Sequence, residues 1–345
     1  AASDVYKRQR RLIIYALSSV LMAITSSLIR ADDLEYTKFV RAHLNRVIQL
    51  SVDDYGPDHT RMWLATIDTS TGRLPEEPLP ADLRWYRKIT SPAGSNLYWD
   101  QPTILAAYAL SERTNDDRYA ASANAYIRDF LKRCVASQSG LFMWGNHIYY
   151  DVVRDQVVPF SGGYHECRPH TPAWECFWKH DAKATERAIR SLGLAHIKDR
   201  ATGRFCRHAN WRVAPDEFSE AEVKKAMPFL EAGATLIDSL CWLAKQTNDD
   251  GELTQMALQA ARYSYAQRNR DTGLLRNQPV VKRWDYFAST TEVGLWAGSL
   301  IRATDYTSNE EFLQIAEAAV RPWLRFGFDG DVGKYYGRLA VDSGT

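Results

Sequence analysis

The chain has 345 residues, of which 45% are hydrophobic, 12% aromatic and 25% charged, so it can build one large globular core. Its formal net charge of +1 excludes the strongly basic surface that nucleic-acid-binding proteins need, and no nucleic-acid partner is expected. The five cysteines show neither CxxC nor zinc-ribbon spacing. An odd number leaves at least one thiol free, and a disulfide between Cys167 and Cys206 stays open.

The N-terminal part of the chain divides into two short segments before the main domain. Residues 1–9 resemble translated adapter sequence and are left out of the fold prediction. Residues 10–31 contain arginines, then an uncharged run over 12–24 and a small-residue exit, a pattern typical of an export signal. The uncharged run is short for a membrane span. We therefore expect an exported protein, periplasmic or secreted, without stable membrane insertion after signal cleavage.

From residue 33 onward, hydrophobic residues recur with a helical period. This pattern predicts helices over 34–50, 101–113, 116–135, 171–196, 220–246, 250–267, 289–303 and 309–326. Residues 67–98 are rich in Pro, Gly, Ser and Thr and are expected to form a loop. Short strands are expected within 141–150 and 204–208. The fold is therefore predicted to be dominated by α-helices.

Two short motifs recur at the ends of these helices. One is a Leu-to-Thr segment followed by Asn or Asp, found at 110–116, 243–249 and 300–305. The other is a tight turn at Thr71-Gly72, Ser139-Gly140, Thr202-Gly203 and Thr272-Gly273. Helices alternating with such turns predict an α/α toroid, an incomplete barrel of helical hairpins with short β segments at the mouth of the site. We expect residues 32–345 to form one such domain, truncated at its C-terminus.

Three polar segments near these turns carry residue types that bind metals. They are 144–151, 164–172 and 202–211, and they contain His147, Glu166 and the pair Arg207-His208. Two imidazoles and a carboxylate can hold a divalent metal with positions open for water and substrate. An adjacent arginine suits an anionic substrate, because its planar fork matches a carboxylate. No short local motif joins the three segments. Equivalent turns should emerge at the same end of a toroid and bring them together.

The sequence resembles polysaccharide lyase family 2, the pectate lyases built on an α/α toroid. The resemblance lies in the order of three motifs: a G-x-H turn ending at His147, then Glu166, then the pair Arg207-His208. The resemblance covers roughly residues 95–330. It implies that the two histidines and Glu166 bind the metal and that Arg207 is the catalytic residue. It also implies an acidic, polygalacturonate-like substrate that is cleaved by β-elimination.

The mixed ligand set favours a transition metal over calcium, with manganese first and cobalt, nickel or zinc as the other candidates. The identity of the base stays open, because an arginine holds its proton tightly. Arg207 would need positive charge beside it, from the metal and Arg204, to act as a base. Otherwise it pairs with the substrate carboxylate, and Tyr149, Lys282 or a metal-bound hydroxide removes the proton.

Aromatic and basic side chains near the turns are candidates for contact with the polysaccharide. They are Trp144, Arg168, His170, Trp211, Lys282, Arg283, Trp284 and Tyr286. Two other functions stay open. A glycoside hydrolase on the same toroid would use paired carboxylates, for which Asp100, Glu231 and Glu292 stand at expected helix starts. A non-catalytic glycan-binding protein would keep the aromatic residues without the metal ligands.

Overall fold

The computed structural model describes residues 36–75, 93–159, 164–212, 218–248, 251–279 and 285–345. The adapter-like segment 1–9, the export signal 10–31 and the basic-aromatic stretch 282–284 lie outside the described residues. Within the described ranges, no helix is both long enough and apolar enough to cross a membrane.

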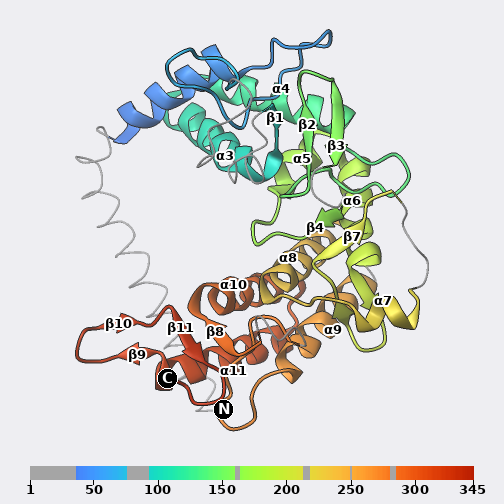
Figure 1. Cartoon of the computed structure of the whole chain (residues 1–345), viewed down its shortest axis with the longest axis vertical. Helices are drawn as coiled ribbons and strands as arrows, with labels where there is room; N and C mark the ends of the chain where they lie inside the picture. The colour runs from blue at the N-terminus through green and yellow to red at the C-terminus, as the bar shows by residue number, and fades with distance from the viewer. Residues whose placement is uncertain (1–35, 76–92, 160–163, 213–217, 249–250, 280–284) are drawn as a thin grey trace, which may run out of the picture.

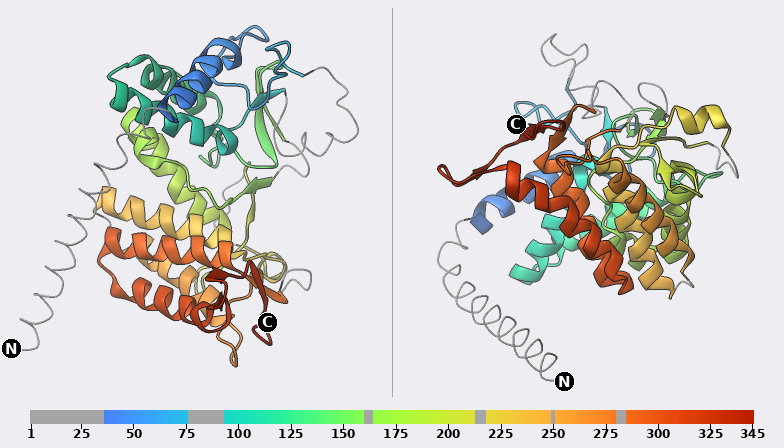
Figure 2. Two further views of the ribbon diagram at one scale, coloured as in Figure 1. Left: turned by 90° about the vertical axis from the view of Figure 1, so that its left-hand side faces the viewer. Right: turned by 90° about the horizontal axis from the view of Figure 1, so that it is seen from below.

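Helices follow one another in an arc (Figures 1 and 2). The first is 36–46, which continues into the π-helical turn Val47–Ser51. The others are α3 (Leu97–Thr114), α4 (Arg118–Arg133), α5 (Trp174–His180), α6 (Ala182–His196), α7 (Glu220–Lys224), α8 (Leu230–Thr247), α9 (Glu252–Ala266), α10 (Thr290–Thr307) and α11 (Glu310–Phe326). The arc starts with helix 36–46 beside α3 and α4, passes through α5 and α6, and ends at α8 to α11 (Figure 1). This is the predicted α/α toroid in its incomplete form.

Two of the predicted helices are each divided in the structure. The helix predicted over 171–196 is interrupted at Asp181, which is extended and whose carboxylate accepts a hydrogen bond from the Ala184 N–H (2.9 Å). The helix predicted over 220–246 is interrupted around Pro228, which has no N–H to continue it. Each break lies inside a hydrophobic pattern that is otherwise helical.

The repeated Thr-Asn/Asp motif ends α3 and α8 in the left-handed conformation, whereas its third copy, at 300–305, lies inside α10, which continues to Thr307 and ends at Ser308. The C-caps of α3, α8 and α10 are Asn115 (φ 53°), Asn248 (φ 48°) and Ser308 (φ 58°). The hydroxyls of Thr114 and Thr247 donate to the carbonyls four residues earlier, within the last turn of α3 and α8. Helix α10 continues about one turn beyond its predicted end.

Short antiparallel strand pairs connect the helical hairpins. Strands β1 (Gly94–Ser95), β2 (Ile148–Asp151) and β3 (Gln156–Pro159) form a three-stranded sheet. Four two-stranded ladders join β4 (Tyr164–Glu166) to β7 (His208–Asn210), β5 (Ile197–Asp199) to β6 (Arg204–Phe205), β8 (Phe287–Ser289) to β11 (Arg338–Ala340), and β9 (Phe328–Asp329) to β10 (Lys334–Tyr335). The predicted strand segments overlap β2, β6 and β7.

The Gly turns share one backbone geometry at successive hairpin ends. Gly140, Gly203 and Gly273 have φ of 78°, 75° and 76°, and each N–H donates to the carbonyl four residues earlier. A Cβ added at Gly203 would lie 2.2 Å from the carbonyl oxygen of Gln259 in α9, so this turn packs directly on the next hairpin. Only glycine combines this φ with so close an approach. The turns therefore fix how neighbouring hairpins lie side by side.

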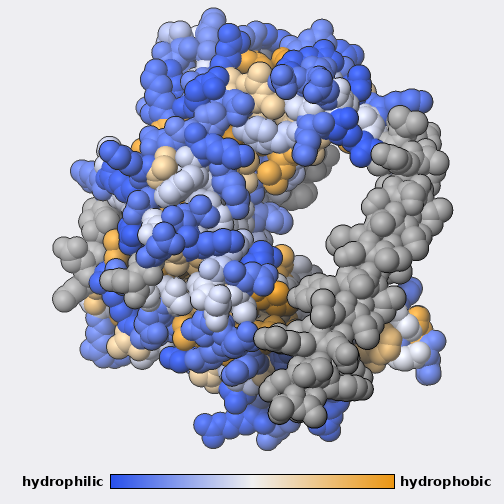
Figure 3. All heavy atoms as spheres, turned by 180° about the vertical axis from the view of Figure 1, so that it is seen from behind, coloured by the Kyte–Doolittle hydropathy of each residue, from blue (hydrophilic) through white to orange (hydrophobic). Residues whose placement is uncertain are grey.

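The hydrophobic core lies between the helices and beneath the short strands. Its largest fully buried side chains include Trp63, Trp144, Trp296, Tyr119, Tyr126 and Tyr150. Seen from the side opposite to Figure 1, the surface is mostly hydrophilic and its hydrophobic side chains form small patches (Figure 3).

Candidate active site

Glu166 and His208 face each other across the β4–β7 ladder. The antiparallel register pairs the two residues, so their side chains leave the sheet on the same face. Nε2 of His208 lies 3.6 Å from Oε1 of Glu166. The neighbouring His165 alternates to the opposite face. It is fully buried, with its Nδ1 2.8 Å from Nε2 of His196 in α6.

His147 reaches the same place from the turn before β2. The turn has φ of 107° at Gly145, and Asn96 at the N-cap of α3 holds both polar groups of this glycine. The Asn96 amide donates to the Gly145 carbonyl (2.7 Å), and its oxygen accepts from the Gly145 N–H (3.2 Å). Nε2 of His147 lies 3.8 Å from Oε2 of Glu166, and the His147 and His208 rings are 5.2 Å apart between centroids. Three residues distant in sequence thus converge.

These three side chains form a donor set that fits a divalent metal. One ligand atom from each of His147, Glu166 and His208 lies within 4.8 Å of the others. Oε2 of Glu166 and Nε2 of His208 are buried without a hydrogen-bond partner among the described residues, a costly state unless a ligand satisfies them. Burial, with Arg207 and Arg168 nearby, lowers the pKa of His208 to about 4. Its imidazole is therefore neutral at neutral pH, as a metal ligand must be.

Arg207 points toward the same group rather than away into solvent. Its guanidinium contacts Oε1 of Glu166, lies 4.0 Å from Oε1 of Glu231, and sits 4.4 Å above the Phe229 ring. Arg207 and the consecutive His208 both reach Glu166, because strand β7 begins only at His208. Burial lowers the pKa of Arg207, and the Glu231 carboxylate acts in the opposite direction.

Arg168 is a second arginine beside Glu166. Its Nη1 lies 3.6 Å from Oε1 of Glu166 and 3.7 Å from Oε1 of Glu231, and its Nη2 donates to the Tyr98 hydroxyl (3.2 Å). The exposed His170 ring lies 5.4 Å from the Tyr98 ring. The sequence indicates Glu231 only as a hydrolase carboxylate and does not single out Tyr98. The one signal for each residue is its place at the start of α8 or α3.

The remaining predicted contact residues are dispersed. Trp144 is only 2% exposed and packs against other aromatic rings, so its expected contact with a sugar is replaced by a place in the core. The reason is that the chain passes through the core before it reaches the His147 turn. Trp211 is partly buried, and Tyr286 is 59% exposed beside β8. Lys282, Arg283 and Trp284 lie outside the described residues.

The carboxylates considered for a hydrolase have different surroundings. Asp100 is buried, and its Oδ2 accepts hydrogen bonds from the Tyr126 hydroxyl (2.6 Å) and the Ser95 hydroxyl (3.1 Å). Burial raises its pKa to about 7. Burial also raises the pKa of Glu292, with the neighbouring Glu231 carboxylate adding to the effect. Asp100 is thus engaged inside the protein, while Glu231 is held between two arginines.

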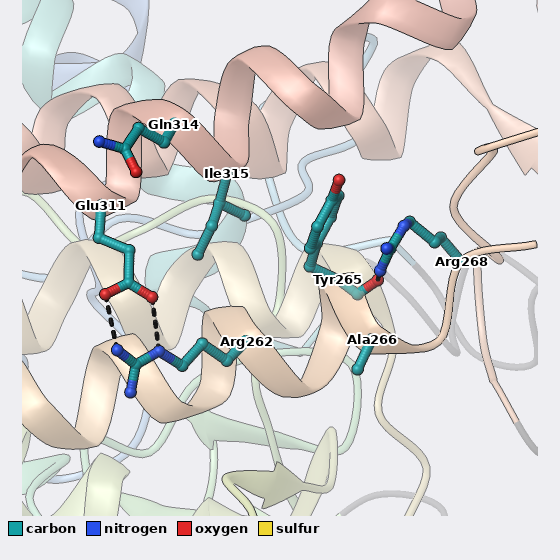
Figure 4. A pocket seen from close by; sticks show the side chains of 7 residues that line it. All are labelled: Arg262, Tyr265, Ala266, Arg268, Glu311, Gln314 and Ile315. Carbon is teal, nitrogen blue, oxygen red and sulfur yellow. Dashed lines mark hydrogen bonds and ion pairs between the residues drawn. The ribbon is translucent and has the colours of Figure 1, made fainter. Parts of the chain in front are cut away.

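Two further features lie apart from this group of residues. A cavity of about 450 Å³ on the outer helices α9 and α11 is crossed by a two-point ion pair, in which Nε and Nη2 of Arg262 each lie 2.6 Å from a Glu311 oxygen (Figure 4). All five cysteines are free thiols. The disulfide left open between Cys167 and Cys206 is therefore not formed.

Comparison with known proteins places the chain in a family. A family model described as periplasmic pectate lyase matches residues 81–283, more than half of the chain. The chain belongs to this family of pectate lyases.

Individual proteins that resemble the chain include one curated relative and two solved structures. A pectate disaccharide-lyase of Dickeya dadantii (strain 3937) is 25% identical over 211 residues, which cover 54% of this chain and 39% of that protein. The chain thus spans about two fifths of the length of this curated relative. A crystal structure of D-mannose isomerase matches with a TM-score of 0.52 at 13% sequence identity, and the match covers 89% of this chain and 75% of the isomerase chain. A sugar epimerase from a ruminal bacterium matches with a TM-score of 0.46 at 16% identity, covering 71% and 64%.

Proposed function

We propose that this protein is a metal-dependent lyase that cleaves a polygalacturonate-like polyuronate by β-elimination. The observation that carries the proposal is the convergence of His147, Glu166 and His208 beside Arg207, in a member of the pectate lyase family. The family description as periplasmic and the predicted export signal support an exported enzyme.

The proposed metal site has two imidazole nitrogens and one carboxylate. This donor set favours manganese, with cobalt, nickel or zinc as alternatives, over calcium, which prefers an all-oxygen shell. When bound, such a metal would draw charge from the uronate carboxylate and acidify the adjacent C5 proton. The two buried ligand atoms without hydrogen bonds, on Glu166 and His208, support this use of the site.

The arginines provide the other chemistry of the proposed reaction. Arg207 is the proposed base for the C5 proton, as the family resemblance implies; burial acts to lower its pKa, and the Glu231 carboxylate acts in the opposite direction. The electron pair of the C5–H bond then forms the C4–C5 double bond, the C4–O bond breaks with its electron pair on the glycosidic oxygen, and that oxygen takes a proton from solvent water. Arg168 is held by Tyr98 and Glu231 and is available to pair with a substrate carboxylate.

Incubation with polygalacturonate, with and without a chelator, tests this function. We expect ultraviolet absorbance from a 4,5-unsaturated product, abolished by the chelator and restored more fully by manganese than by calcium. Reducing sugar without absorbance would indicate a hydrolase instead. The absence of both signals would indicate a glycan-binding protein. An undiminished lyase rate after complete metal removal would overturn only the proposed role of the metal.

A further inference from the structure

A cavity of about 610 Å³ opens beside His208, between β5, β7 and α7. Its lining includes Tyr164, Lys198, His208, Asn210, Phe218 and Lys225. The volume falls within the roughly 300–1,000 Å³ typical of small-molecule sites. Because His208 belongs both to this lining and to the candidate metal site, the cavity adjoins that site at His208.

Lys198 gives this cavity a partly buried positive charge. Its ammonium lies 3.8 Å over the Phe218 ring and donates to the Ala195 carbonyl (2.7 Å). Among the described residues, no carboxylate lies within ion-pair distance of Lys198; burial lowers its pKa, and the more distant Glu222 carboxylate acts in the opposite direction. Glu222 also lines the cavity, but its carboxylate caps α7 through the N–H and hydroxyl of Ser219 (3.0 and 2.8 Å). An ammonium has three N–H donors, so Lys198 retains capacity for an anion.

Two more groups suit a sugar acid at this place. Lys225 is exposed at the rim and, within the described part of the chain, forms no ion pair. Tyr164 is 49% exposed and stacks on the His208 ring, with centroids 5.6 Å apart and planes at 21°. The Tyr164 ring, which also lines the cavity, therefore packs on a proposed metal ligand. Positive charge beside an aromatic face suits a sugar ring that carries a carboxylate, because the aliphatic face of the sugar can pack on the aromatic ring.

We propose that this cavity is a subsite for a second uronate unit of the polymer bound at the metal site. Lys198 and Lys225 bind the carboxylate of this unit, and Tyr164 contacts its ring. The identity of the polymer rests on the proposed function, whereas the binding of an acidic oligosaccharide here depends only on the residues of the cavity.

Binding of trigalacturonate, measured by titration calorimetry on the whole chain, tests the subsite. Lys198→Met keeps an apolar stem of similar length and removes the charge. We expect it to raise the Kd about tenfold, which corresponds to ~1.4 kcal/mol. Lys245→Met is the matched control, because Lys245 also lies over an aromatic ring, Tyr306 at 5.5 Å, but in α8. This control should bind as the wild type does. Fully methyl-esterified trigalacturonate should bind equally well to the wild type and to Lys198→Met.

The outcomes separate the subsite from the proposed function. The calorimetry needs no turnover, so an inactive wild type would overturn the proposed function while the Kd values still decide the subsite. An unchanged Kd for trigalacturonate in Lys198→Met would overturn the subsite, as would an equal loss of affinity for the esterified trimer. If Lys198→Met does not fold, Lys225→Met at the exposed rim replaces it. The expected increase in Kd is then about threefold, and no change would overturn the proposal.

Discussion

Replacement of Arg207 by lysine separates proton removal from carboxylate binding. The Arg207 guanidinium contacts Glu166, lies 4.0 Å from Glu231 and stacks over Phe229. Lysine keeps a positive charge but presents a compact ammonium without the planar fork. It therefore cannot keep the contacts with both carboxylates. The three proposed metal ligands are untouched, so metal content should equal that of the wild type.

The expected effect of Arg207→Lys falls on the chemical step. Loss of one preorganised group at a reacting centre costs roughly 10²–10³ in kcat, or about 2.7–4 kcal/mol of transition-state stabilisation. If Arg207 acts only in the transition state, kcat falls by this factor and KM changes little. If it only anchors the carboxylate, KM rises and appreciable turnover remains.

Initial rates of unsaturated-product formation over a range of polygalacturonate concentrations, with metal content by plasma emission, provide the measurement. Arg302→Lys is the matched control, because Nε and Nη2 of Arg302 each lie 2.9 Å from an Asp238 oxygen, joining α10 to α8. Arg302→Lys also replaces a partly buried arginine that contacts carboxylate oxygens, but away from the candidate site. A raised KM with unchanged kcat in Arg207→Lys would refute the assignment of proton removal. An equal loss in both variants would trace the effect to stability.

Three further substitutions test other parts of the molecule. Glu166→Gln should lower the bound metal per chain, and wild-type stoichiometry would contradict its role as a ligand. Folding raises the pKa of Asp100 to about 7 from 3.8, so the folded state holds this proton more tightly. The stability that the Asp100 carboxyl contributes is fully present below pH 4. The free energy of unfolding then falls by about 4 kcal/mol as the pH rises to 7. Asp100→Asn should remove that pH dependence of the melting temperature, and an unchanged slope would contradict it. Gly203→Ala should cost more unfolding free energy than Gly333→Ala, because both have positive φ (75° and 66°) but only at Gly203 would a Cβ collide with backbone. Equal losses in urea denaturation would contradict this reasoning.

Local sequence determines the repeating frame of this fold. A glycine turn can be predicted from the adjacent residues in the sequence alone. The turns at Gly140, Gly203 and Gly273, where glycine adopts the left-handed conformation, are therefore predictable. The helical hydrophobic pattern predicts most helices for the same reason, since 3.6-residue periodicity is a property of one segment. It misses the interruption at Asp181, because a single capping residue inside an apolar pattern leaves the periodicity unchanged.

The sequence also singles out His147, Glu166 and His208, through residue type and family resemblance. It gives no distance between them, because the side chains come from separate hairpins. Their proximity depends on the register of β4 with β7 and on the way in which Asn96 holds the turn at Gly145.

Only the tertiary structure decides which other side chains join this group. Glu231 lies between Arg168 and Arg207 because the start of α8 comes next to the β4–β7 ladder, an arrangement that no local pattern encodes. Trp144 belongs to the core, although its place beside the turn suggests a sugar contact. Burial and ion pairing arise from packing between segments distant in the chain. Residue type and spacing therefore indicate which chemistry is available, and packing determines which residues can carry it out together.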